Sequence, residues 1–136
     1  MNTQKNINNI AYKIVGCAIE VHKHLGSGLL ESVYDEYLID ELKRNNLHVR
    51  SQVYVPLNYK DKKLNTNLKL ELLVKESVIV ELKSVEQMIP LYAAQLLSYL
   101  KLTDKPNSLS INFNSENISK QLISLVSDIF AKLPKE

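Results

Sequence analysis

The stretch LELLVKESVIVELK, residues 70–83, sets the architecture of this chain. Runs of strand-forming residues from Leu64 to Val74 and from Val78 to Lys83 flank a short polar segment, Lys75-Glu76-Ser77. A connection this short and polar is typical of a hairpin. The two runs are therefore expected to pair as antiparallel strands.

Glu71, Glu81 and Lys83 fall within these strands, although a carboxylate in a half-buried strand costs several kcal/mol unless a partner compensates it. Side chains alternate between the faces of a strand, so Glu81 and Lys83 project together. Glu71 falls roughly opposite Glu81 across the hairpin, with a residue of slip or a bulge allowed. Two such acids repel each other unless a divalent cation lies between them, and Mg²⁺ is the natural candidate because it prefers oxygen ligands. The alternative is an ordinary ladder of charges on an exposed sheet face.

The remaining segments alternate between helical and strand-like spacing of their apolar residues. Helices are predicted over residues 7–25, 29–45, 90–102 and 118–129, and further strands over residues 52–57 and 108–113. This order, helix, helix, three strands, helix, strand, helix, predicts an α/β fold with a mixed four-stranded sheet flanked by helices. A length of 136 residues suits one core, so residues 1–136 are expected to form a single domain.

Composition narrows the class of protein. Hydrophobic residues make up 45% of the chain and charged residues 24%, as in a folded globular protein rather than a disordered one. No apolar run approaches the roughly 18 residues of a membrane span, and the polar start is unlike a signal peptide, so we expect a cytoplasmic protein without a membrane partner. Cys17 is the only cysteine, which excludes an intrachain disulfide, and we expect it in the core.

The formal net charge of +2 is too small to indicate nucleic-acid binding by itself. Any contact with nucleic acid must therefore be local. The best local candidate is the group Lys60, Lys62 and Lys63 around Asp61, at the turn predicted between the first two strands. The alternative is that these lysines are simply a solvated surface.

Several segments resemble those of the PD-(D/E)XK nuclease superfamily. Residues 79–83, IVELK, preceded by residues 70–74, LELLV, are similar to the two metal-binding motifs of that superfamily. Residues 28–34, GLLESVY, match the pattern that gives the GxxExxY proteins their name, a bacterial and archaeal branch. The resemblance runs from about Ile14 to Asn114, about three quarters of the chain.

This resemblance implies a Mg²⁺- or Mn²⁺-dependent nuclease that hydrolyses phosphodiester bonds in DNA. It implies metal ligation and catalysis by a set of three acids and one lysine: Glu31, Glu71, Glu81 and Lys83. Gln95 and Tyr99 resemble a Gln-x-x-x-Tyr element that shapes the site and contacts substrate, and their spacing of four residues places them on one helix face. The alternative role of Glu31 is to balance the positive start of its helix.

One position departs from the superfamily pattern. Active members usually have Asp where this chain has Glu71, and the extra methylene disturbs a metal that demands near-octahedral geometry. Two other functions are therefore kept open: a weakened or inactive nuclease fold that binds nucleic acid or protein, and a homodimeric accessory protein that pairs an exposed strand or helix with its copy.

Overall fold

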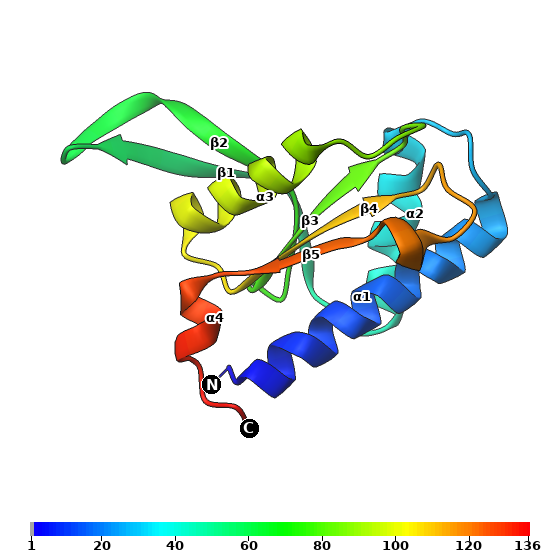
Figure 1. Cartoon of the computed structure of the whole chain (residues 1–136), viewed down its shortest axis with the longest axis horizontal. Coiled ribbons are helices and arrows are strands. Elements are labelled where there is room, and N and C mark those ends of the chain that lie inside the picture. The colour runs from blue at the N-terminus through cyan, green and yellow to red at the C-terminus, as the bar shows by residue number, and fades with distance from the viewer. Residues whose placement is uncertain (1) are drawn as a thin grey trace.

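The computed structural model describes residues 2–136 and contains a five-stranded sheet with helices on both faces (Figure 1). The helices are α1 (Gln4–Leu25), α2 (Glu31–Arg44), α3 (Pro90–Thr103) and α4 (Asp128–Lys132), with a short 3₁₀ helix η1 (Ile118–Gln121). The strands are β1 (Val49–Tyr59), β2 (Lys62–Val74), β3 (Val78–Lys83), β4 (Asn107–Asn112) and β5 (Ile123–Val126). No helix within residues 2–136 is long and apolar enough to span a membrane.

The strands lie in the order of the sequence, from β1 to β5. All neighbours are antiparallel except β3 and β4, which run parallel because α3 carries the chain back between them. Pro90 occupies the first turn of α3, where its missing N–H costs no hydrogen bond. The predicted α/β class with a mixed sheet is confirmed.

The prediction of four strands, ending in a helix over residues 118–129, is wrong. Residues 123–126 form β5, which pairs antiparallel with β4, and α4 contains only five residues. The apolar spacing of this segment fits a helix, but pairing with β4 satisfies the backbone groups that β4 would otherwise leave open at the sheet edge. With a strand on each side and helices on both faces, β4 has all six residues buried.

Two hydrophobic clusters hold the sheet between its helices. On one face, α1 and α2 pack against alternate residues of the central strands, among them Val78, Val80 and Leu82. On the other face, Leu100 of α3 joins a smaller cluster with Ile79. Glu81 and Lys83 alternate with Leu82 along β3, so they lie on the face that α3 covers.

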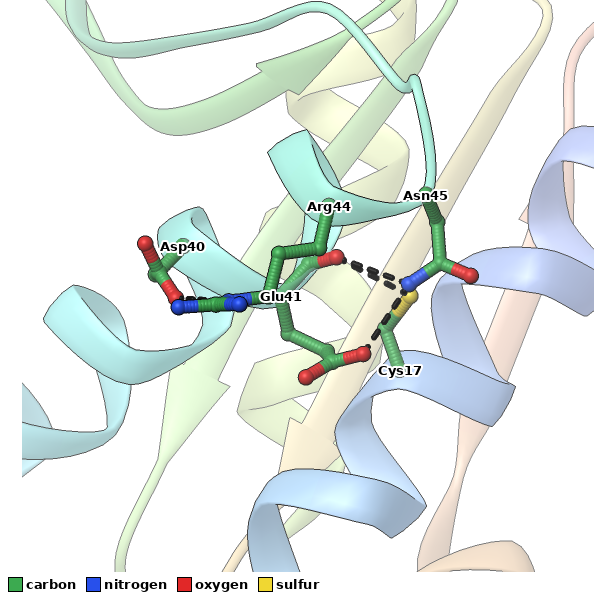
Figure 2. Close-up of polar contacts among 5 residues, drawn as sticks. All are labelled: Cys17, Asp40, Glu41, Arg44 and Asn45. Carbon is green, nitrogen blue, oxygen red and sulfur yellow. Dashed lines mark hydrogen bonds and ion pairs between the residues drawn. The ribbon is translucent and has the colours of Figure 1, made fainter.

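The end of α2 is fixed against α1 (Figure 2). The Cys17 thiol donates to the carbonyl oxygen of Glu41 at 3.9 Å, and the Asn45 amide donates to the same oxygen at 2.8 Å and to the Glu41 carboxylate at 3.0 Å. Burial, reinforced by the Glu41 carboxylate, raises the pKa of the Cys17 thiol to about 11. Cys17 is therefore a neutral core residue at physiological pH, as predicted.

Tyr34 anchors the loop between α1 and α2. Its hydroxyl donates to the carbonyl oxygen of Gly26 at 2.6 Å and accepts from the N–H of Leu29 at 3.2 Å. Its ring stacks on Phe113 with 4.4 Å between centroids, and the side chain is fully buried. Gly28 has a φ of 97°, a conformation that other residues rarely adopt. The glycine and the tyrosine of the GLLESVY segment are therefore structural.

Replacing Tyr34 with Phe should lower the free energy of unfolding by about 1–2 kcal/mol, because Gly26 and Leu29 lose their buried partner. Urea denaturation measures this change. Tyr37→Phe in the same helix is the matched control, since Tyr37 is 49% exposed and should change stability by less than about 0.5 kcal/mol. Equal effects of the two substitutions would contradict the anchoring role.

Candidate functional site

Pairing between β2 and β3 ends at the pair Leu72–Val80. Beyond this pair, the two strands are joined by hydrogen bonds from side chains to the backbone instead of bonds between the two backbones. The N–H of Glu71 donates to Oε2 of Glu81 at 3.0 Å, and the N–H of Leu82 donates to Oε1 of Glu71 at 2.9 Å. Glu71 and Glu81 thus lie opposite each other, each carboxylate bound to the backbone of the other strand.

Strand β2 is distorted at Glu71. Leu70 and Leu73 both join the cluster around Leu100, although residues three apart in a regular strand point to opposite faces. Gln52, the β1 residue beside this point, has a φ of 52°. Such local departures from a regular ladder redirect side chains and often lie next to functional sites. Here the distortion lies where the sheet opens between β2 and β3.

Helix α2 brings Glu31 to the end of β3. The Glu31 carboxylate accepts from the backbone N–H of Ser84 at 3.1 Å, and the Ser84 hydroxyl donates to the carbonyl oxygen of Leu29 at 2.6 Å. Glu31 is also the first residue of α2, where a negative charge complements the helix dipole. Glu31 therefore lies beside the end of β3 and also balances the positive start of α2, so the two roles considered for it are compatible.

A fourth acid, Asp35, belongs to this group and was not predicted. It follows Glu31 by one helical turn, and its carboxyl lies close enough to the Glu71 carboxyl for each to influence the pKa of the other. Its Oδ1 atom is buried and has no hydrogen-bond partner within residues 2–136. The signal that would have identified it is its spacing of four residues from Glu31, which places both acids on one helix face.

Burial, and next to it crowding, makes Glu71, Asp35 and Glu81 difficult to ionise. Burial raises the pKa of Glu71 from 4.5 to about 9, with Asp35 and Glu81 adding to the shift and the N–H of Leu82 opposing it. Burial also raises the pKa values of Asp35 and Glu81. Like charges in a place with little water disfavour simultaneous ionisation unless a cation joins them.

Lys83 supplies the positive charge at this site. Its Nζ lies 4.5 Å from the centroid of the Tyr92 ring, at the start of α3, in a cation–π contact. Its ammonium also acts to lower the pKa of Glu81, against the stronger effect of burial. The lysine is half-buried on the face of β3 that carries Glu81.

Helix α3 closes the other side of the group. Tyr99 packs against the cluster beneath α3, and burial, with the nearby Glu81 and Glu71 carboxylates, raises the pKa of its hydroxyl. Gln95 is half-buried one turn earlier on the same helix. By contrast, Lys60 and Lys62 are exposed at the far end of the β1–β2 hairpin, and Lys62 lies nine residues, roughly 30 Å of strand, from Glu71. The structure does not bring these two lysines to the carboxylates.

The donor atoms at this site match a hard divalent cation in kind. Carboxylate oxygens are the ligands that Mg²⁺ and Mn²⁺ prefer, and the orphaned Oδ1 of Asp35 is a buried acceptor without a partner. One oxygen each of Glu71 and Glu81 is already bound to a backbone N–H. Within the described residues, no group of three or more acids, histidines or cysteines is arranged to hold a metal as the side chains stand.

An α/β sheet that opens beside acids and a lysine on adjacent strands defines a nuclease-fold protein. The family model of the PD-(D/E)XK nuclease superfamily matches residues 8–125, and the chain belongs to this superfamily. Comparisons with curated proteins and with solved structures give no significant match.

The raised pKa values predict that the protein loses stability as pH rises. Between about pH 5 and pH 9 the folded state holds protons that the unfolded state has released, so the free energy of unfolding falls across this range. Glu71→Gln removes the largest of these shifts. The free energy of unfolding of this variant should exceed that of the wild type by about 1–3 kcal/mol at pH 8, because water reaches part of the site and weakens the effect of burial. The two proteins should be equally stable near pH 4.

Thermal unfolding between pH 4 and pH 9, in buffer with a metal chelator, measures this difference. Glu36→Gln serves as the control because Glu36 is exposed on the same α2 helix. Parallel pH profiles for the wild type and Glu71→Gln would show that Glu71 ionises normally.

Proposed function

We propose that this chain is a Mg²⁺- or Mn²⁺-dependent nuclease that hydrolyses phosphodiester bonds in DNA. The observation that carries the proposal is the gathering of Glu31, Glu71, Glu81 and Lys83 where β2 and β3 separate. The proposal includes that residues 1–136 act as one cytoplasmic domain and that the chain is a member of the GxxExxY branch, on the GLLESVY segment.

The proposed metal ligands are Glu31, Glu71 and Glu81, with Asp35 beside them. A divalent cation bound to such carboxylates supplies a Lewis acid and lowers the pKa of bound water. The acids would hold that cation against the cost of ionising in a place with little water, and burial makes this cost large for Glu71. The two strands and α2 fix the relative positions of these side chains through the contacts to Leu82 and Ser84.

Lys83 is the proposed catalytic lysine. Its ammonium, held over the Tyr92 ring and beside Glu81, can stabilise negative charge on a phosphate oxygen or orient the attacking water. Tyr99 and Gln95 are proposed to line the substrate side of the site from α3. This assignment is supported by the proximity of the Tyr99 hydroxyl to Glu81 and Glu71.

The second candidate function is binding without catalysis. In this case the chain keeps the nuclease fold and binds nucleic acid or protein, as a monomer or a homodimer. One observation favours it. Glu71 is one methylene longer than the usual Asp and reaches across the strand gap to the N–H of Leu82, which occupies one of its oxygens. A carboxylate committed to the backbone in this way holds a metal less well.

Cleavage of labelled DNA in the presence of Mn²⁺ tests the first proposal. The double substitution Glu81→Ala with Lys83→Ala should lower the cleavage rate by about 100-fold or more, because it removes a metal ligand and the stabilising charge together. Glu36→Ala with Lys43→Ala is the matched control, since both residues are exposed on α2. Cleavage that survives the first pair of substitutions would reject the assigned site.

The substitution Glu71→Asp separates the two candidate functions. The shorter side chain cannot reach Leu82, so both of its oxygens become available, and the affinity for Mn²⁺ should rise several-fold. Calorimetric titration measures this affinity, with Glu36→Asp as the control. An unchanged or weaker affinity would show that the length of Glu71 does not limit metal binding.

A further inference from the structure

Residues 53–70 form a two-stranded hairpin that projects from the body of the sheet and is called the arm below (Figure 1). Because β3 pairs with β2 only as far as Leu72, the arm has no third strand beside it. It extends roughly 20 Å from Val53 to Tyr59, at about 3.3 Å per residue. Its base adjoins Glu71, so a ligand that occupies the full length of the arm reaches the carboxylate site at the base, whereas the tip lies roughly 30 Å of strand away.

The arm carries the positive excess of the chain. It contains four lysines and one aspartate, a net charge of +3, whereas the whole chain has +2 and the rest therefore −1. None of these lysines forms an ion pair with an acid in the part of the chain that the structure describes. The arm is thus a local basic surface, which the small net charge of the whole chain does not reveal.

The two faces of the arm differ in character. Directly opposed residues lie on the same face, and the pairs Val53–Leu70 and Val55–Leu68 form an apolar face that packs toward the cluster around Leu100. The other face is polar and exposed, and contains no acid. Its members are Tyr54 with Lys69, Pro56 with Asn67, and Asn58 with Lys63.

The tip places further charge at the end of the ribbon. Lys60 and Asp61 have φ values of 49° and 64°, which makes a two-residue turn of the type that matches the twist of paired strands. Asn and Gly are the usual residues in such turns, and a lysine in this conformation is strained. The Lys60 ammonium lies 5.3 Å from the centroid of the exposed Tyr59 ring.

We propose that the arm enters the major groove of double-stranded DNA and holds the duplex beside the carboxylate site. A two-stranded ribbon fits this groove, which is roughly 12 Å wide. The lysines neutralise phosphates, while Asn58 and Asn67 on the polar face can hydrogen-bond to base edges. The inference rests on the proposed function, because it adds the form of the nucleic-acid substrate to that function.

The same features argue against other nucleic acids. The major groove of an RNA duplex is too deep and narrow for a ribbon to read. Single strands are usually bound by aromatic rings that stack on successive bases. Tyr54 and Tyr59 are 66% and 60% exposed, but they lie five residues apart in one strand and so on opposite faces of the arm. They do not form one stacking platform.

Binding to a short labelled DNA duplex, measured by fluorescence anisotropy with a metal chelator so that no cleavage occurs, tests the arm. Lys63→Thr with Lys69→Thr should weaken binding by about tenfold or more at about 100 mM salt, and should lower the slope of log affinity against log salt by about 2. Lys5→Ala with Lys13→Ala removes the same charge from the exposed side of α1 and should leave binding nearly unchanged.

Equal weakening by both pairs of substitutions, or no weakening by either, would overturn the role of the arm. A preference for single-stranded DNA or for an RNA duplex would overturn the choice of ligand. Sedimentation showing a dimer that the arm substitutions dissociate would assign the arm to a second copy of this chain instead. Cleavage is measured separately. Duplex binding through the arm without Mn²⁺-dependent cleavage would refute only the proposed nuclease activity. Cleavage together with binding that does not depend on the arm would refute only the proposed role of the arm.

Discussion

The organisation of this protein depends on the crowding of acidic side chains where two strands part. The Glu71 and Glu81 carboxylates end the β2–β3 ladder by accepting from backbone N–H groups of the opposite strand, those of Leu82 and Glu71, while α2 brings Glu31 and Asp35 against the same opening. Burial and like charge make full ionisation of this group costly without a cation. The acids therefore lower the stability of the fold when they ionise, and a divalent cation bound between them would remove most of this cost.

Much of this arrangement could be predicted because it follows from short-range rules. The polar Lys75-Glu76-Ser77 turn fixes the register of β2 against β3, and strand alternation then places Glu71 opposite Glu81 and Lys83 beside it. The spacing of Gln95 and Tyr99 likewise follows from the helical repeat. These relations need only the local period of the backbone, which the sequence specifies directly.

The features that could not be predicted depend on contacts distant in sequence. Strand β5 forms because β4 offers an open edge, although its own four residues fit a helix equally well. Asp35 is defined as a site residue only by its contact with Glu71 on another element. Lys60 and Lys62 were predicted at a turn as a local nucleic-acid contact, but the distance of that turn from the carboxylates depends on β3 being shorter than β2, which leaves the two lysines at the tip of an unsupported arm.

The raised pKa of Glu71 means that its carboxyl should retain a proton at neutral pH until a cation replaces it. Carbon-13 NMR of the glutamate and aspartate carboxyl carbons, followed from pH 4 to pH 10 with and without Mg²⁺, measures this directly. We expect the Glu71 carboxyl to titrate near pH 9 without Mg²⁺ and at distinctly lower pH with it. Titration of Glu71, Glu81 and Asp35 near pH 4 to 5 in both conditions would contradict it.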